Sequence, residues 1–148
     1  MTDVLTAEQR RFNMSRVHSK NTKPELLLRG GLHARGFRFR LHRRDLPGSP
    51  DLVFPCFQAV VLVNGCFWHG HDCPKSKLPT TRTEFWSTKI ANNRARDARV
   101  LQALAEAGWR TLVIWECKLM GSERQPIEET IDRIAAWLRS DQSSGLIL

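Results

Sequence analysis

Three cysteines and one histidine have the side chains and the spacing of a metal site. Cys66, His71 and Cys73 lie within eight residues, and Cys117 follows after 43 intervening residues. Thiolate and imidazole ligands in this number are typical of a tetrahedral structural zinc site. In the alternative, Cys66 and Cys117 are small buried hydrophobic residues, as free cysteines often are. Cys56 has no partner in the pattern, and we expect it to fill space in the core or on the surface.

A carboxylate at the start of a short strand offers a second kind of metal site. Asp51 follows Pro50 and precedes the apolar run Leu-Val-Phe, and a longer apolar run begins within ten residues. Mg²⁺ prefers carboxylate, carbonyl and water oxygens, so one aspartate and a backbone carbonyl can hold it beside a phosphate. This hairpin layout resembles that of the restriction-endonuclease-like nucleases, although "VVLVNG" lacks their usual second acidic residue and lysine. By itself, a Pro-Asp pair is more typical of a turn or a cap.

Two large aromatic side chains lie inside the cysteine-histidine segment. Phe67 and Trp68 directly follow Cys66. An average adjacent pair of this kind fills a hydrophobic core. When a bound metal ties the segment down, two neighbouring side chains are less expected to point inward together. We therefore keep a second interpretation, in which this pair meets a flat partner at the surface.

The candidate metal ligands lie at the ends of predicted strands. The continuous apolar run in "AVVLVNG" (59–65) and the largely apolar "WRTLVIWEC" (109–117) predict two buried strands that end at or just before Cys66 and Cys117. The helical pattern of residues 83–107 lies between them and predicts an α/β crossover. If the two strands are neighbours, their ends meet and the four metal ligands assemble.

Further helices and strands complete the predicted domain. Thr22 and Glu25 fit a capping box at the start of a helix that ends near Gly36, although Gly30-Gly31 weakens its pattern. Residues 37–42 alternate apolar and basic, which predicts a strand with one solvated, positive face, and residues 51–54 predict a short strand. Residues 126–140 predict a last amphipathic helix.

The composition narrows the class of protein. The chain has 148 residues, 41% of them apolar, which suits one domain with its own core. Lys and Arg number 23 against 15 Asp and Glu, and the net charge of +8 favours a polyanionic partner such as nucleic acid, although many small proteins are simply basic. Nothing resembles a membrane span or a cleavable signal, and clustered cysteines near histidine suit the reducing cytoplasm.

Three regions are expected along the chain. Residues 1–22 form a basic N-terminal arm, residues 23–140 form a single domain, and residues 141–148 form a loose tail. Between residues 10 and 23 there are five Lys or Arg and no acidic residue, so this segment is predicted to be irregular and exposed. It is either a solvated tail or an arm that follows a nucleic-acid strand.

Four segments, in order, closely resemble the very short patch repair (Vsr) mismatch endonucleases: "LPGSPDLVF", "GCFWHGHDC", "TRTEFW" and "GWRTLVIWEC". The resemblance covers roughly residues 13–138, and the second segment followed by the third is highly specific. It implies an α/β, restriction-endonuclease-like fold with a central mixed β-sheet flanked by helices and a structural zinc site. It also implies a Mg²⁺-dependent enzyme that nicks one DNA strand 5′ of the T in a T·G mismatch left by deaminated 5-methylcytosine, which starts very short patch repair.

The resemblance assigns roles in the active site to four residues. It implies that Asp51 is the catalytic aspartate that binds Mg²⁺ and that the main-chain carbonyl of Val63 joins this metal site. It places His69 near the attacking water and gives Glu25 a hydrogen bond to metal-bound water. Glu25 remains open to its capping-box role as well.

The resemblance also assigns zinc ligands and contacts with DNA. The implied structural zinc ligands are Cys66, His71, Cys73 and Cys117. The aromatic residues implied to wedge into DNA beside the mismatch are Phe67, Trp68 and Trp86. The basic arm is implied to lie against the minor groove, through Arg10, Arg11, Arg16 and Lys20.

One departure from the family pattern bears on activity. Asn64 stands where well-known members carry a histidine that contacts the metal-bound water, and asparagine cannot take a proton near neutral pH. A catalytically weakened, zinc-containing DNA-binding protein is therefore an alternative, and a structure-selective nuclease for RNA or unmispaired DNA is another. Gly70 and Asp72 thin the histidine-rich run of the family, at positions that are not predicted ligands.

The resemblance finally implies a cellular setting. The substrate is double-stranded DNA with a T·G mismatch, and the protein is expected to act as a monomer in the bacterial cytoplasm, associated with the nucleoid. Mismatch-repair proteins and a cognate cytosine methyltransferase are the expected functional partners, and no membrane is involved.

Overall fold

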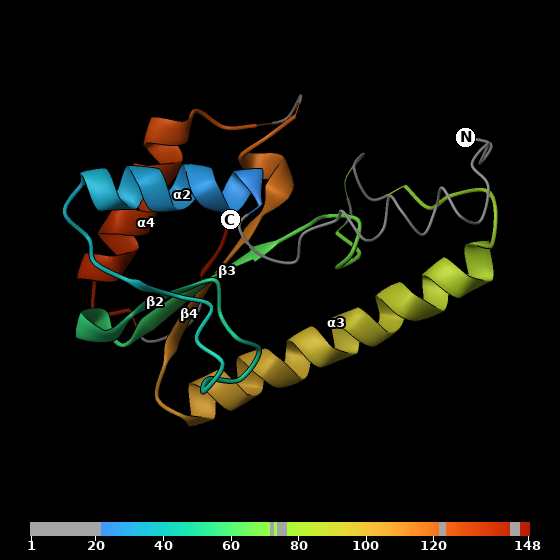
Figure 1. The fold of residues 1–148 in the computed structure, drawn as a ribbon, viewed down its shortest axis with the longest axis horizontal. Helices are drawn as coiled ribbons and strands as arrows, with labels where there is room; N and C mark the ends of the chain where they lie inside the picture. The colour runs from blue at the N-terminus through green and yellow to red at the C-terminus, as the bar shows by residue number, and fades with distance from the viewer. Residues whose placement is uncertain (1–21, 72, 74–76, 122–123, 143–145) are drawn as a thin grey trace.

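A five-stranded mixed sheet is the centre of the fold (Figure 1). The computed structural model describes residues 22–71, 73, 77–121, 124–142 and 146–148. The strands, in spatial order, are β1 (Arg40–Leu41), β2 (Leu52–Phe54), β3 (Ala59–Asn64), β4 (Arg110–Trp115) and β5 (Leu146–Ile147). β2 is antiparallel to both β1 and β3, whereas β4 is parallel to both β3 and β5. The predicted mixed sheet is confirmed.

The crossover predicted between the two buried strands is also confirmed. The helix α3 (Thr83–Glu106) connects β3 to β4, and these strands pair in parallel along their whole length, from Ala59 opposite Arg110 to Asn64 opposite Trp115. Gly108 has φ +87°, a backbone conformation that glycine adopts without strain, and it turns the chain from α3 into β4. The carboxyl ends of β3 and β4 consequently lie side by side.

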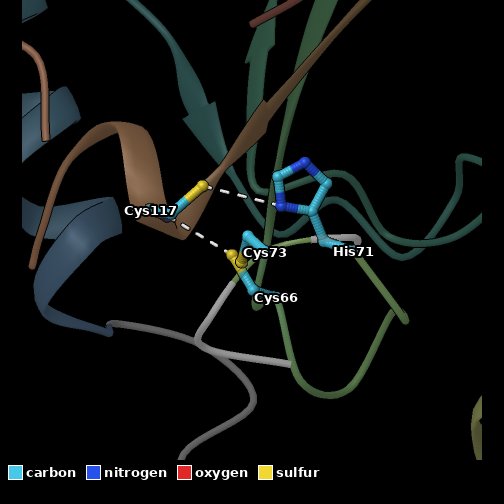
Figure 2. Close-up of side chains that lie close together, drawn as sticks. All are labelled: Cys66, His71, Cys73 and Cys117. Atoms are coloured by element: carbon cyan, nitrogen blue, oxygen red, sulfur yellow. Dashed lines mark hydrogen bonds between the residues drawn. The ribbon is translucent and has the colours of Figure 1, made fainter. Parts of the chain in front are cut away.

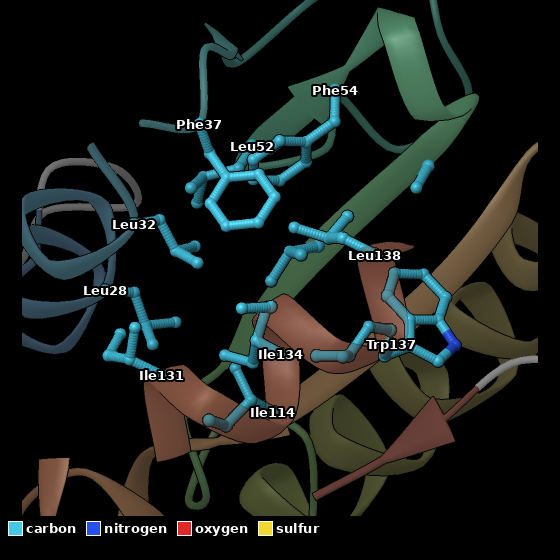
Figure 3. Packing of buried hydrophobic residues seen from close by; sticks show 14 of the residues in the cluster. Leu28, Leu32, Phe37, Leu52, Phe54, Ile114, Ile131, Ile134, Trp137 and Leu138 are labelled. Atoms are coloured by element: carbon cyan, nitrogen blue, oxygen red, sulfur yellow. The ribbon is translucent and has the colours of Figure 1, made fainter. Parts of the chain in front are cut away.

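Helices cover both faces of the sheet. α2 (Lys23–Ala34) and α4 (Ile127–Arg139) pack together on one face, where Leu28 and Ile134 belong to the main hydrophobic core (Figures 1 and 3). A smaller core joins α3 to the other face through Leu104 and Val53. Because successive strand residues point to opposite faces, two buried faces explain why β3 is apolar from Ala59 to Val63.

The contact between α2 and α4 depends on a missing side chain. A Cβ atom placed on Gly31 would lie 2.8 Å from both Cγ1 and Cδ1 of Ile131, whereas one on Gly30 would meet nothing within 4 Å. Gly31 therefore lets the two helices approach closely. The glycine pair that weakens the helical pattern in the sequence serves, at one of its two positions, the packing of the core.

Two sequence-based expectations at the ends of this domain are wrong. Residues 141–148 were expected to form a loose tail, but Leu146–Ile147 pairs with β4, and Leu148 is buried with its N–H donated to the Val113 carbonyl. Edge pairing and burial of a terminal leucine offset the cost of ordering the chain there. Thr22 is the N-cap of α2, but its side chain makes no capping hydrogen bond, so the predicted capping box does not form.

The first half of α3 extends away from the sheet (Figure 1). Of the 24 residues of this helix, only Ile90 and Leu104 are buried. The helix therefore presents most of its length to solvent and forms one side of a cleft. None of the helices in the described part of the chain combines the length and apolar content needed to cross a membrane.

Candidate active site and metal centre

A cleft of about 1220 Å³ opens beside the carboxyl end of β3. Its walls are the start of α2, the loop before β2, the segment after β3 and one side of α3. The cleft is lined by five side chains to which the sequence analysis gave roles: Asp51, Asn64, Phe67, Trp68 and His69.

Asp51 lies directly before β2, with its carboxyl group directed at β3. Its Oδ2 accepts a hydrogen bond from the Val63 N–H at 2.7 Å. The pKa of Asp51 is raised to about 7, mainly by burial and also by the nearby Glu25 carboxyl group, while the Val63 hydrogen bond lowers it in part. A nearby cation would stabilise the ionised form of a carboxyl group in this environment, as expected of a metal ligand.

Glu25 and His42 complete a cluster of possible metal ligands around Asp51. Glu25 is only 1% exposed, and its carboxylate contacts His42 Nε2 at 2.6 Å and Arg29 Nη1 at 3.2 Å. One ligand atom from each of Glu25, His42 and Asp51 lies within 4.8 Å of the other two. Two carboxylates and an imidazole are a suitable donor set for a divalent cation.

His42 is a member of this cluster that the sequence analysis missed. β1 and β2 pair with Leu41 opposite Leu52, and the His42 N–H continues this ladder by donating to the Asp51 carbonyl at 3.3 Å. Extending the antiparallel register by one residue places His42 directly opposite Asp51. The alternation of residues 37–42 predicts a strand there, but not the register that brings His42 opposite Asp51.

His69 pairs with an aspartate that the sequence analysis also missed. The Nδ1 atom of His69 lies 2.5 Å from Oδ2 of Asp97, a residue of α3. A carboxylate at Nδ1 fixes the orientation of an imidazole and favours the tautomer that carries its proton at Nδ1. The structure thus joins His69 to a partner 28 residues further along the chain.

The segment that carries His69 is held against α3. Asn93 of this helix donates a side-chain hydrogen bond to the Trp68 carbonyl at 2.9 Å. Gly70 has φ +66°, and a Cβ atom there would lie 2.7 Å from Cγ2 of Ile90. Gly70, one of the departures from the family pattern, is therefore the residue that allows this close contact.

Val63 and Asn64 are the last two residues of β3 and line the cleft beside Asp51. The Val63 N–H is engaged by Asp51, and the metal-binding role of its carbonyl stays a prediction. Asn64 pairs in register with Trp115 of β4, so it lies at the meeting point of the two parallel strand ends.

A second cluster forms where β3 and β4 end (Figure 2). One ligand atom from each of the four predicted residues, Cys66, His71, Cys73 and Cys117, lies within 4.8 Å of the others. The Cys117 N–H donates to Cys66 Sγ at 3.4 Å, and Cys117 Sγ lies 3.6 Å from His71 Nδ1. Trp115 stacks on the His71 ring, with 4.2 Å between ring centroids. The chain segments therefore converge as predicted, and the set could hold a metal ion.

The chemistry of these four donors fits a soft cation. Burial raises the pKa of Cys66 to about 12, and the neighbouring thiols of Cys73 and Cys117 raise it as well, against a backbone hydrogen bond that lowers it. The pKa of Cys117 is also raised, mainly by burial. Thiolates this close together are unfavourable without a cation between them, and thiolate with imidazole is a donor set that transition metals prefer. Cys56 is exposed and takes no part.

Three aromatic side chains form a cluster, and two of them, Phe67 and Trp68, line the cleft. Phe67, Trp68 and Trp86 contact one another edge to face, with ring centroids 5.1 to 5.8 Å apart. All three are partly exposed, so neither Phe67 nor Trp68 is an ordinary core residue. Phe85, which is 45% exposed, extends the cluster by packing against Trp86 at 5.1 Å.

Basic side chains surround the same cleft. Its lining includes Lys23, Arg44, Lys89 and Arg96, and Lys89 Nζ also lies 5.7 Å from the centre of the Trp68 ring. None of these four residues was predicted to be functional from the sequence. The predicted basic arm, with Arg10, Arg11, Arg16 and Lys20, lies outside the described residues.

The mixed sheet with flanking helices has the architecture of the restriction-endonuclease-like fold, and a cluster of possible metal ligands lies at the start of β2. A family model described as "DNA mismatch endonuclease Vsr" matches residues 2–75. The chain belongs to this family of DNA mismatch endonucleases, and is accordingly a hydrolase that cleaves DNA.

Similarity to individual relatives extends over most of the chain. The Type II nicking enzyme V.XorIIP of Xanthomonas oryzae pv. oryzae is 56% identical over 119 residues, which cover 80% of this chain and 88% of that enzyme. The DNA mismatch endonuclease Vsr of Escherichia coli is 40% identical over 147 residues, covering 99% and 94% of the two chains. The nicking enzyme V.NmeAIP of Neisseria meningitidis is 43% identical over 119 residues, covering 80% and 85%.

Proposed function

We propose that this protein is a Mg²⁺-dependent enzyme that nicks one DNA strand 5′ of the T in a T·G mismatch. Such mismatches arise when 5-methylcytosine is deaminated, and the nick starts very short patch repair. The observation that carries the proposal is one cleft lined by Asp51, His69, Phe67 and Trp68, with Trp86 packed against the two aromatic rings. Groups suited to hydrolysis and groups suited to base contact thus share one site.

His69 is the proposed proton acceptor for the attacking water. The Asp97 carboxylate holds its Nδ1 atom at 2.5 Å, so the proton resides on Nδ1 and the Nε2 atom is left to take a proton from water. Asp97 also stabilises the positive charge that His69 acquires. An imidazole that accepts the proton and a carboxylate that orients this imidazole are a common pair in hydrolytic sites.

Asp51 and the Val63 carbonyl are proposed to hold Mg²⁺ in the cleft, and Glu25 beside Asp51 is proposed to hydrogen-bond a water bound to the metal. When bound, Mg²⁺ supplies positive charge at the phosphate oxygens. The raised pKa of Asp51 supports this role because a cation relieves the repulsion between the two carboxyl groups. Arg29 offsets part of the remaining charge on Glu25.

The aromatic cluster is proposed to recognise the mismatch. A ring inserted between bases gains apolar contact but must offset the cost of unstacking, which is a few kcal/mol per step. A T·G step is easier to open than a matched one, so insertion discriminates between them. Lys89 and Arg96 on α3 are proposed to hold the phosphates near the cleft, and the N-terminal arm is proposed to lie in the minor groove.

The second cluster is proposed to hold a structural zinc ion. Three thiolates and one imidazole complete a tetrahedral set with no position for substrate, as in closed structural sites. The ion would tie the segment that carries Phe67, Trp68 and His69 to the end of β4. Zinc and Mg²⁺ then have separate tasks, the first in folding and the second in cleavage.

The cellular setting is proposed from the same family membership. The relatives named above come from bacteria, and we infer that this protein acts on the chromosome in a bacterial cytoplasm, as a monomer. The chemistry of the substrate points to a cytosine methyltransferase as the source of the mismatch. Mismatch-repair proteins are proposed as further partners.

Nicking of a T·G duplex tests the catalytic assignment. With Mg²⁺, the parent should cut only the strand that contains the mismatched T, and Asp51→Ala should lose cutting by about a thousandfold or more, since removing such a charged group costs several kcal/mol in the transition state. Asp51→Ala should still bind the duplex, because phosphate contacts supply most of the affinity. Asp45→Ala removes an exposed carboxylate from the same loop and is the matched control.

The same assay separates the remaining candidate functions. A parent that binds T·G duplexes tightly but never nicks them would be a catalytically inactive DNA-binding protein. Nicking by Asn64→His would then show that Asn64 is the cause of the lost activity. Cutting of RNA or fully paired DNA at the rate seen with T·G would replace mismatch repair with a broader nuclease activity.

Trp68→Ala tests how the mismatch is recognised. Loss of the ring should reduce the preference for T·G over T·A duplexes by about 5- to 150-fold, corresponding to about 1–3 kcal/mol of base stacking. Binding to the T·A duplex should change little, because that affinity comes from phosphates. The measurement is binding and nicking of both duplexes at one salt concentration. Equal losses on the two duplexes would show that Trp68 is a packing residue.

A further inference from the structure

The carboxylate cluster around Asp51 includes a histidine, His42. Mg²⁺ usually binds oxygen ligands, so a nitrogen donor is unexpected at a Mg²⁺ site. His42 Nε2 lies 2.6 Å from Glu25 Oε1, and atoms of Glu25, His42 and Asp51 form one group of three potential ligands within 4.8 Å. The proposed function assigns His42 no task. Its side chain is nevertheless directed into the cluster from the strand end opposite Asp51.

We propose that His42 is a third protein ligand of the catalytic cation and that the site consequently binds Mn²⁺ more tightly than Mg²⁺. The inference rests on the proposed function in one respect, namely that the Asp51 cluster holds the catalytic cation. It adds a ligand and a metal preference to that site.

The arrangement of the backbone supports a ligand role because it prepares the three donors before a metal arrives. Glu25 is held in the first turn of α2 and is only 1% exposed, and Asp51 is fixed by the Val63 N–H. The backbone of His42 is tied to Asp51 by the hydrogen bond from its N–H, and its side chain is half-buried. Little conformational entropy is then lost when a cation joins the three groups.

The chemistry of the donors supports the preference for Mn²⁺. Mg²⁺ demands near-ideal octahedral oxygen coordination and gives up its water reluctantly, whereas imidazole is a better ligand for first-row transition metals. Two carboxylates also balance the charge of a divalent cation, so with a neutral imidazole no third charged group is needed. A nitrogen donor therefore shifts the selectivity of the site away from Mg²⁺ and toward Mn²⁺.

Mn²⁺ binding to the zinc-containing protein tests the proposal without any cleavage reaction. The free Mn²⁺ signal in electron paramagnetic resonance should show one tight site in the parent, and echo-modulation spectra of the bound ion should show a coordinated ¹⁴N nucleus. His42→Gln should lose the nitrogen signature and bind Mn²⁺ at least about tenfold more weakly, as expected for groups in or next to a metal's ligand shell. His33→Gln, at an exposed histidine of α2, should match the parent.

Competition by Mg²⁺ distinguishes a ligand from a residue that only orients Glu25. Displacing bound Mn²⁺ from the parent should need a large excess of Mg²⁺, and this excess should fall at least about tenfold in His42→Gln. The proposal would be overturned if His42→Gln bound Mn²⁺ and Mg²⁺ more weakly by the same factor. It would also be overturned if the nitrogen signature of bound Mn²⁺ were unchanged in this variant. Asp51→Asn should abolish tight Mn²⁺ binding, and tight binding that survives this change would place the ion elsewhere and also overturn it.

The outcome is independent of nicking. A parent that binds Mn²⁺ through nitrogen but never nicks T·G DNA would contradict the proposed function and leave the His42 site intact. A parent that nicks normally while His42→Gln binds both ions like the parent would leave the function intact and remove His42 from the site.

Discussion

The Asp51 carboxyl group is held where its ionised form is unfavourable. Burial, with Glu25 beside it, raises its pKa from the ordinary 3.8 to about 7, so the folded protein binds a proton there more tightly than the unfolded chain does. The stability that follows from this proton is fully present below pH 3.8 and is lost as the pH rises through about 7. Without a cation beside it, the ionised Asp51 carboxyl group therefore destabilises the folded protein at neutral pH.

Asp51→Asn should raise the melting temperature of the Mg²⁺-free protein at pH 8. The free-energy gap between variant and parent should widen with pH between about 4 and 7, by at most about 1.4 kcal/mol per pH unit. Thermal unfolding over this range measures the gap, and added Mg²⁺ should narrow it by stabilising only the parent. Asp45→Asn is the control, because the Arg43 hydrogen bond lowers the pKa of Asp45 and its loss should not stabilise the protein. A gap that does not vary with pH would contradict this account.

The contact of α2 with α4 leaves no room for a side chain at Gly31. Gly30→Ala should stabilise the protein by about 0.5–1 kcal/mol, because alanine has a higher helix propensity than glycine and this position is exposed. Gly31→Ala gains the same helix propensity but forces Cβ against Ile131, and overpacking of this kind costs about 1–3 kcal/mol. Gly31→Ala should therefore be the less stable of the two variants by chemical denaturation. The same stability in both would show that Ile131 moves aside at no cost.

On the scale of the whole domain, the Cys-His cluster joins the segment after β3 to the end of β4. If it holds zinc, the ion supports the loop that carries the catalytic and aromatic residues as well as the core. Cys117→Ser should lower both the zinc content and the melting temperature, since structural zinc supplies on the order of 10 kcal/mol of folding free energy in finger peptides. Cys56→Ser, at an exposed cysteine, should change neither. Folded parent protein that contains no zinc after purification without chelators would refute the assignment.

Much of the architecture followed from local pattern. The apolar runs at 59–65 and 109–117 and the helical period between them predicted β3, β4 and the crossover, because strands buried on both faces need apolar side chains throughout. The cysteine and histidine spacing then predicted the cluster at the strand ends, since the carboxyl ends of neighbouring parallel strands meet at one edge. The motif around Cys66 carried the family resemblance that the comparisons with known proteins confirm.

The pairings inside the cleft depended on the folded chain. His42 meets Glu25 across 17 residues, and His69 meets Asp97 across 28, and neither spacing has a signature in the sequence. A hydrogen bond between distant residues is set by how helices pack on the sheet, whereas sequence periodicity reports only which face of one helix or strand is buried. The pairing of residues 146–148 with β4 was missed for the same reason. Three apolar residues have no strand pattern of their own, and only the folded chain places the open edge of β4 beside them.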